Sequence, residues 1–393
     1  MSPPFGNEVL QTLADLVRIN SINPNYTDGV RELSIAEYIE QFFVKRGVET
    51  RRQEVFPGRP NIIARIPGRD TSRRMIFEAH MDTVGVANMS LPPWEATIRD
   101  GKLFGRGACD TKGGLAAMMH AVASLAKAPT PNIDVWLAAT IDEEFSYRGV
   151  LALCNEGLNQ QPLQAEAAIV AEPTDLRAVI ASKGLVRFKI ETRGTSAHSA
   201  KPHLGVNAIE HMALIIAALA ADTRDIARSP HPLLGPPTCN VGTIQGGTQI
   251  NFVPDHCEIE VDRRMLPHEE TVVVLSHYRQ LLERVANKLP KADFILHEPM
   301  LTDLPLETDA NLPAVKKLTN VLQVLGLDAS PMGVPFCSDA SKFGARQIPS
   351  MILGPGSIDQ AHAAVEFVDC DQVLQAAQIY RDYVYQWEPH NAA

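Results

Sequence analysis

The stretch Met75-Ile76-Phe77-Glu78-Ala79-His80-Met81-Asp82-Thr83-Val84 is an apolar run that stops at a histidine and an aspartate two residues apart. If the run is a strand, His80 and Asp82 lie on one face at its carboxyl end, because residues of equal parity point the same way. In an open α/β sheet, ligands bind at that end. A neutral imidazole is a good metal ligand, and a nearby carboxylate can orient it. A strand that simply ends in polar turn residues would explain the same pattern.

The composition is typical of a soluble globular protein, with 45% apolar and 21% charged residues. At 393 residues the chain is too long for one ordinary core, so we expect two domains. A formal net charge of -10, without a long basic run, argues against nucleic acid and anionic membranes as partners and leaves small-molecule substrates open.

The start of the chain, its apolar runs and its cysteines indicate the cellular compartment. The start of the chain lacks the features of a secretory signal, and the apolar run at 212–221 is too short to span a bilayer. Six scattered cysteines without a Cys-x-x-Cys pair favour reduced thiols over disulfides or a thiolate metal site. We therefore expect a cytoplasmic protein.

Strand-like and helical segments alternate in the first half of the chain. Two amphipathic helices come first, and strand-like runs follow at 61–66, 74–79 and 134–141, with a helix at about 112–126 between the last two. This alternation predicts an α/β domain with a mixed sheet.

From residue 184 the predicted order changes to βαββαβ, which is the ferredoxin-like split unit. We expect this α+β unit, residues 184–297, to be inserted into an α/β domain formed by residues 1–183 and 298–393. Insertion is tolerated where exposed chain ends lie close together.

A second candidate residue lies in a glycine-rich turn at 105–114. The turn fails both the Walker and the dinucleotide glycine spacings, so a phosphate loop is not predicted. It presents one acid, Asp110, just before a helix, where a capping role would explain it equally well.

Polar side chains that could bind metal also follow three further apolar runs. The strand at 134–141 continues into Asp142-Glu143-Glu144, and crowded carboxylates are unfavourable unless cations or water compensate. The run at 167–171 ends at Glu172, and His362 follows a glycine-rich turn after the strand at 350–353. Two imidazoles and several carboxylates without thiolates suit zinc, cobalt or manganese, and their number suits two ions that share a bridging aspartate. The simplest interpretation is a two-metal hydrolytic site.

The chain resembles the zinc-dependent deacylase and exopeptidase family that includes acetylornithine deacetylase, succinyl-diaminopimelate desuccinylase, aminoacylases and bacterial glutamate carboxypeptidase. The similarity covers nearly the whole chain, and its motifs occur in order at family-like spacing. They are His80-Met81-Asp82-Thr83-Val84, 105–114, Asp142-Glu143-Glu144, Ala171-Glu172-Pro173-Thr174, Ser196-Ala197-His198-Ser199, Asp262-Arg263-Arg264 and 354–362.

This resemblance implies the metal ligands. Asp110 would bridge two divalent ions, which in this family are typically zinc. His80 and Glu172 would complete the protein ligands of one ion, and Glu144 and His362 those of the other. The peptide bond after the bridging aspartate is often cis in the family, here Asp110-Thr111.

The resemblance also implies the catalytic and substrate-binding residues. Glu143 would be the general base, and Asp82 would support His80. His198 would reach the site from the inserted domain of a partner subunit and stabilise the oxyanion, which implies a homodimer and a hinge closure. Asn251 and Arg264 match positions that resemble binders of a substrate carboxylate.

The predicted activity is removal of an acetyl or succinyl group from an N-acyl amino acid such as N-acetylornithine or N-succinyl-diaminopimelate. Glu172 is typical of the family's deacylases, and the stretch 354–362 looks closest to acetylornithine deacetylase. The chain departs from that enzyme's usual pattern at 181–184 and at 336–339. A dipeptidase or carboxypeptidase of the same family is the enzymatic alternative, and an inactive metal-binding scaffold is the alternative from another class.

Overall fold

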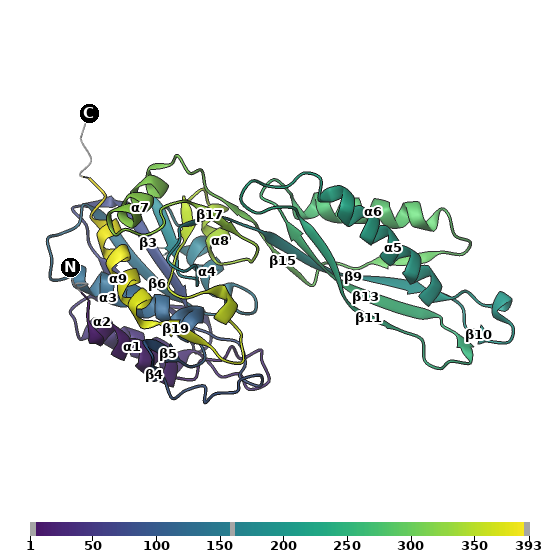
Figure 1. The fold of residues 1–393 in the computed structure, drawn as a ribbon, viewed down its shortest axis with the longest axis horizontal. Helices are drawn as coiled ribbons and strands as arrows, with labels where there is room; N and C mark the ends of the chain where they lie inside the picture. The colour runs from purple at the N-terminus through teal and green to yellow at the C-terminus, as the bar shows by residue number, and fades with distance from the viewer. Residues whose placement is uncertain (1–4, 158–161, 389–393) are drawn as a thin grey trace. The chain divides into compact units, whose positions relative to one another are not determined.

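The computed structural model describes residues 5–157 and 162–388 (Figure 1). Within it the chain divides into two compact units. The first comprises residues up to 180, 308–332 and the residues from 338 onward, and the second comprises residues 181–307 and 333–337. None of the helices in the described ranges combines the length and apolar character needed to cross a bilayer.

The first unit is built on a mixed sheet, as predicted. Its strands follow the order β1-β2-β6-β3-β7-β18-β8. Strands β6, β3, β7 and β18 run parallel, while β1, β2 and β8 pair antiparallel with their neighbours. The bounds are β1 (Glu49–Phe56), β2 (Arg59–Ile66), β3 (Asp70–His80), β6 (Ile133–Thr140), β7 (Ala167–Val170), β8 (Val179–Ser182) and β18 (Ser350–Ile352).

One face of this sheet carries the main hydrophobic core. Met75, Phe77 and Ala79 of β3 belong to that core, because alternate residues of a strand point to the same face. The ring of Phe77 lies 5.5 Å from that of Tyr380. The helices that contribute core residues are α1 (Asn7–Arg18), α2 (Leu33–Val44), α3 (Gly113–Leu125), α7 (Pro313–Val324) and α9 (Cys370–Val384).

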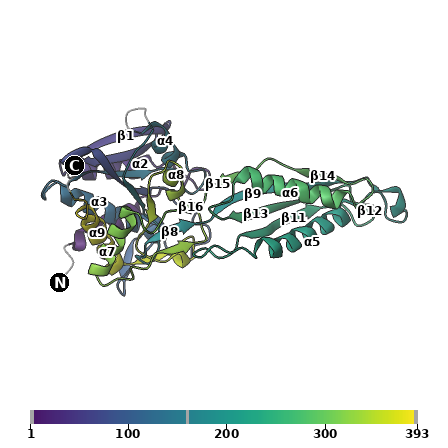
Figure 2. The same cartoon turned by 90° about the horizontal axis from the view of Figure 1, so that it is seen from above.

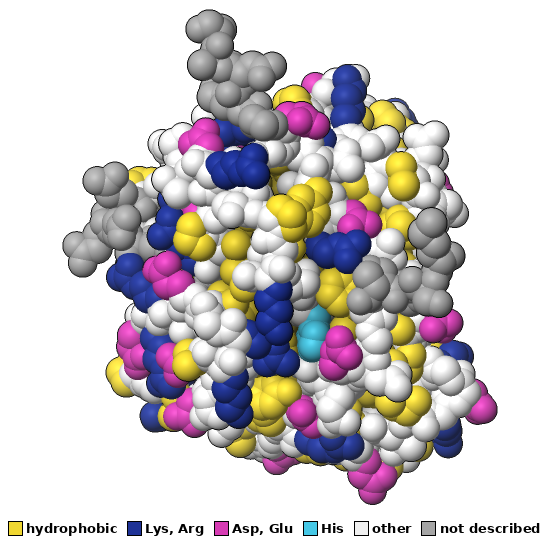
Figure 3. Space-filling view, turned by 90° about the vertical axis from the view of Figure 1, so that its left-hand side faces the viewer, with side chains coloured by type: hydrophobic (Ala, Val, Ile, Leu, Met, Phe, Trp, Pro, Cys, Tyr) yellow, Lys and Arg dark blue, Asp and Glu magenta, His cyan; other side chains and the backbone are white. Residues whose placement is uncertain are grey.

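Two shorter helices, α4 (Arg148–Glu156) and α8 (Ala340–Gly344), contact each other, and α8 also contacts β7 and β18. A separate three-stranded sheet has the order β19-β5-β4, with bounds Phe367–Asp369, Lys102–Phe104 and Thr97–Arg99. On the face drawn in Figure 3, acidic and basic side chains are interspersed, without one large patch of a single sign.

The second unit has the predicted βαββαβ order. Its elements are β9 (Gly184–Arg193), α5 (Ala208–Ile226), β11 (Thr238–Gly246), β13 (His256–Met265), α6 (Thr271–Ala286) and β14 (Asp293–Leu296). The antiparallel sheet has the order β11-β13-β9-β14, and α5 and α6 lie side by side on one of its faces (Figure 2). Alternate residues of β13 are buried, including Ile259 and Val261, which pack in the core of this unit.

This unit extends beyond the segment that the sequence pattern marked out. Strand β15 (Leu301–Asp303) pairs with β9, so residues 298–307 belong to the second unit rather than to the resumed first one. Its hydrogen bonds to a distant strand, rather than any local pattern, join residues 301–303 to the second unit. Strand β1 was also not predicted, because most of its residues are exposed or only partly buried and it shows no strict apolar alternation.

Candidate metal centre

The parallel strands bring the polar residues that were predicted at their carboxyl ends to one edge of the sheet. His80 at the end of β3 is in register with Thr140 at the end of β6, and Asp142-Glu143-Glu144 follow directly. Val170 at the end of β7 pairs with Glu78 of β3 and with Ile352 of β18, and Glu172 and His362 come after those two strands. Parallel strands share the direction of their carboxyl ends, so residues far apart in sequence meet there.

Asp110 lies between the two imidazoles. Its Oδ1 is 3.1 Å from His80 Nε2, and its Oδ2 is 3.2 Å from His362 Nε2. The peptide bond between Asp110 and Thr111 is cis. One carboxylate that presents a different oxygen to each histidine has the arrangement expected of a bridging metal ligand.

Two sets of donor atoms share this aspartate, and the atoms within each set lie within 4.8 Å of one another. One set is His80, Asp110 and Glu172, and the other is Asp110, Glu144 and His362. Glu144 Oε1 lies 3.1 Å from His362 Nε2, and Glu172 Oε1 lies 4.0 Å from His80 Nε2. Imidazole and carboxylate donors without thiolates fit zinc, cobalt or manganese. The residues present therefore fit a pair of divalent cations.

The site gathers several carboxylates, and bound cations would stabilise their ionised forms. Burial, together with the neighbouring carboxylates, raises the pKa values of Glu143 and Glu172 well above the ordinary range. The hydrogen bonds that His362 donates to the carboxylates of Asp110 and Glu144 raise the pKa of His362 to about 11. Burial opposes ionisation of Asp110, but hydrogen bonds from His362 and His80 outweigh it and hold the Asp110 pKa below its usual range. Asp110 is thus held in its ionised form between the two histidines, where it can accept two cations.

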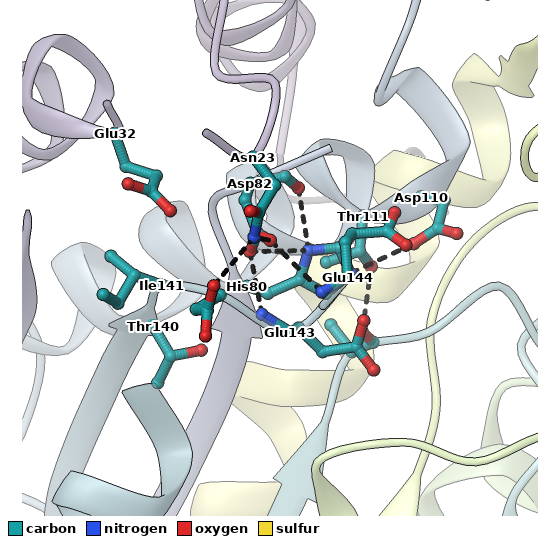
Figure 4. Close-up of polar contacts among 12 residues, drawn as sticks. Asn23, Glu32, His80, Asp82, Asp110, Thr111, Thr140, Ile141, Glu143 and Glu144 are labelled. Carbon is teal, nitrogen blue, oxygen red and sulfur yellow. Dashed lines mark hydrogen bonds and ion pairs between the residues drawn. The ribbon is translucent and has the colours of Figure 1, made fainter. Parts of the chain in front are cut away.

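The main chain and the side chain of Asp82 make separate contacts. His80 Nδ1 lies 2.9 Å from the main-chain carbonyl oxygen of Asp82, whereas the nearest carboxylate oxygen is 3.7 Å away. The carboxylate instead accepts the main-chain N–H groups of Glu143 and Glu144, each at 3.1 Å (Figure 4). It also accepts the side-chain amide of Asn23 at 2.7 Å. The main chain of Asp82 therefore orients His80, while its side chain holds the acidic turn.

Asn23 was missed by the sequence interpretation, since it lies on a loop without a strand-end or motif signal. It is fully buried, and its Nδ2 donates to Asp142 as well, at 3.0 Å. Asp142 also pairs with Arg59 at 3.1 Å, and Arg59 in turn pairs with Glu32. The side chain of Asp142 is thus engaged in this buried network, which leaves Glu143 and Glu144 as the acids available to the centre.

The remaining predicted residues lie in the second unit. His198, in the short strand β10 (Ala197–His198), is exposed, and its Nδ1 accepts the N–H of Ala200 at 3.0 Å. Asn251 is a neighbour of this segment, because its carbonyl oxygen accepts the N–H of Ser199 at 3.0 Å. Arg264 is separate from both and pairs with Asp262 at 2.8 Å.

Arg263, the neighbour of Arg264 in the same motif, is only 2% exposed. Its guanidinium group donates to the hydroxyl of Tyr278 at 3.1 Å and pairs with Glu269. On β13 its parity places it on the face covered by the helices, together with Val261 and Met265. Arg263 is therefore part of the interior of the second unit.

Comparisons with known proteins agree with this geometry. The model of peptidase family M20/M25/M40 matches residues 76–386. An acetylornithine deacetylase of Vibrio parahaemolyticus is 31% identical over 379 residues, which cover 94% of this chain and 95% of that protein. A probable succinyl-diaminopimelate desuccinylase of Staphylococcus epidermidis is 25% identical over 404 residues, with 95% and 96% covered. The crystal structure of aminopeptidase PepT from Bacillus cereus has the same fold, with a TM-score of 0.79 at 22% identity and coverage of 97% and 98%.

These matches and the paired donor sets define the class of protein as a metal-dependent hydrolase. The chain belongs to peptidase family M20/M25/M40, and the predicted resemblance is thereby confirmed.

Proposed function

We propose that the protein is a two-metal amidohydrolase that removes an acyl group, acetyl or succinyl, from an N-acyl amino acid. The observation that carries the proposal is the position of Asp110, whose two oxygens face His80 and His362 at 3.1 and 3.2 Å. Divalent ions held by the two donor sets would lower the pKa of a water molecule and polarise the amide carbonyl. Zinc is the proposed metal, with cobalt or manganese as substitutes, because all the donors are imidazole or carboxylate groups.

Glu143 is the proposed general base. It belongs to neither of the donor sets found among the described residues, although it comes directly before the ligand Glu144. A carboxylate with a raised pKa can take a proton from the attacking water and hold it long enough to pass it to the departing nitrogen. The nitrogen needs that proton to leave as an amine. The contact between Asp82 and the N–H of Glu143 supports a fixed position of the main chain for this transfer.

His198 is the proposed oxyanion donor, supplied by the inserted unit of a partner chain in a homodimer. Its exposure supports a role toward a partner or a substrate, because an exposed imidazole ring can reach either. Asn251 and Arg264 are the proposed binders of the substrate carboxylate, because an amide and a guanidinium group both donate to carboxylate oxygens. The six free cysteines support a reducing compartment, and we place the enzyme in the cytoplasm.

Two observations favour deacylation. Glu172 belongs to one of the donor sets. At this position the deacylases of the family that the sequence resembles typically have glutamate. The relative from Vibrio parahaemolyticus carries the name acetylornithine deacetylase and covers nearly the whole chain. The competing candidate, a dipeptidase or carboxypeptidase, is favoured by the fold shared with an aminopeptidase.

A substrate panel tests the proposal. The protein, reconstituted separately with zinc, cobalt and manganese, is assayed on N-acetyl amino acids, N-succinyl amino acids and dipeptides. We expect amine release from an N-acyl amino acid such as N-acetylornithine or N-succinyl-diaminopimelate. Turnover of dipeptides alone would establish the peptidase, and stoichiometric metal binding without turnover of any substrate would establish the inactive scaffold.

A further inference from the structure

A hydrogen-bonded frame of three side chains joins two of the metal ligands through their main chains. We call Glu366, Arg106 and Asn88 the Glu366 frame. Glu366 is fully buried, and its Oε1 accepts the main-chain N–H groups of Cys109 at 3.0 Å and of Asp110 at 3.1 Å. The other carboxylate oxygen, Oε2, accepts Nη1 of Arg106 at 2.7 Å. One end of the frame therefore holds the backbone of the bridging aspartate.

The other end of the frame holds His362. Arg106 Nη2 donates to Oδ1 of Asn88 at 3.0 Å, and Nδ2 of Asn88 donates to the main-chain carbonyl oxygen of His362 at 2.8 Å. The chain of contacts thus runs from the Asp110 amide through Glu366, Arg106 and Asn88 to the His362 carbonyl. It links two ligands that belong to distant parts of the sequence.

His362 needs such support more than the other imidazole does. The side chain of His362 is 53% exposed, whereas that of His80 is 2% exposed and sits at the end of a buried strand. The backbone of His362 has φ +57°, a left-handed conformation that is costly for a residue with a side chain. Because this ring is only half-buried, its position depends on its contacts with Asp110 and Glu144 and on the hydrogen bond that its main chain accepts from Asn88.

We propose that Asn88 is a positioning residue that, through Arg106 and Glu366, holds His362 against Asp110 and thereby sets the affinity of the Asp110–Glu144–His362 donor set for its cation. The inference rests on the proposed two-metal function and deepens it. Some residues hydrogen-bond to a metal ligand without touching the metal themselves. Replacing such a residue typically weakens metal affinity ~10–100-fold.

Asn88 is the best place to test the frame because it is exposed, so its substitution leaves the core intact. Asn88→Ala removes both of its contacts. Asn88→Asp keeps an oxygen for Arg106 but removes the N–H that His362 accepts. Asn320→Ala is the matched control, because the amide of the exposed Asn320 makes one comparable contact, to Gln386 at 3.0 Å, on another part of the first unit.

The experiment is a calorimetric titration of the metal-free full-length protein with Zn²⁺, combined with thermal unfolding of the metal-free form. For wild type and Asn320→Ala we expect two binding steps. For both Asn88 variants we expect one step to weaken ~10–100-fold and the other to stay within about twofold, with the same unfolding temperature in the metal-free state.

Two unchanged steps in both Asn88 variants would overturn the inference. Equal weakening of both steps would also overturn it, because the frame would then act on both donor sets rather than on the one that contains His362. A lower unfolding temperature of the metal-free form would overturn it as well, because the frame would then act on the fold. A wild-type protein that binds fewer than two ions would instead contradict the two-metal function itself. The two failures are therefore distinguishable.

Discussion

The carboxylate oxygen Oδ1 of Asp82 accepts the main-chain N–H of Glu143 at 3.1 Å, and its partner oxygen accepts that of Glu144 at the same distance. One buried carboxylate thus holds the segment that carries both the proposed base and a metal ligand. Asp82→Asn would replace one acceptor by an N–H donor that faces another N–H. We expect kcat to fall ~10–100-fold, since the acidic turn would shift, while His80 keeps its contact with the main chain.

The measurement for Asp82→Asn is steady-state kinetics together with metal content by elemental analysis. A loss confined to KM, or an unchanged kcat, would contradict the positioning role.

Glu143→Gln separates proton transfer from metal binding. Glutamine has nearly the same shape but cannot accept and return a proton, so we expect kcat to fall by a factor of ~10²–10⁴. The metal content should stay at two ions per chain, because Glu143 is in neither donor set. Glu144→Gln is the matched comparison, and there we expect loss of one ion. Full activity of the Glu143 variant would remove this residue from the mechanism.

Removal of metal should lower thermal stability as well as activity. The carboxylates of Glu143, Glu144 and Glu172 are buried close together, and burial and mutual repulsion raise their pKa values. Bound cations relieve that repulsion, and a ligand at 100 times its Kd stabilises a protein by about 2.7 kcal/mol. We expect a chelator to lower the Tm measured by calorimetry and added Zn²⁺ to restore it. An identical Tm with and without chelator would show that the site binds no metal.

His120 should make the first unit less stable at low pH. It lies in the interior with its Nε2 2.8 Å from the hydroxyl of Thr12, and burial lowers its pKa from 6.5 to about 4. Between these values the unfolded chain binds the proton and the folded chain does not. The stabilising contribution is therefore present above pH 6.5 and is lost as the pH falls toward 4, by about 3 kcal/mol.

The test for His120 compares wild type with His120→Gln in urea unfolding at pH 7 and pH 4.5. The variant should lose less stability over this interval. Equal losses in the two proteins would contradict the assignment.

His198→Ala should slow turnover by a factor of ~10²–10³ if the ring stabilises the oxyanion. His203→Ala is the control, because His203 is exposed on the same part of the second unit. Steady-state kinetics of the two variants on the substrate found in the panel give the comparison. Equal rates in His198→Ala and wild type would mean that His198 takes no part in the reaction.

The sequence predicted the main elements of both units and the metal donors because these features have local signals. Apolar runs that stop at His80, Asp142 or Glu172 indicate strand ends, and the parallel strands do bring them together. The βαββαβ order was likewise readable from periodicity alone, and the observed sheet order agrees with it.

The sequence by itself therefore determined the fold class and the residue types of the donor sets. Only the tertiary structure decided how those residues are supported: Asp82 holds the acidic turn, Asn23 bridges two aspartates, and Glu366 joins the amide of Asp110 to the frame that holds His362. The reason is physical. Hydrophobic periodicity is a property of neighbouring residues, whereas these hydrogen bonds join loops that approach one another only after the sheet has formed.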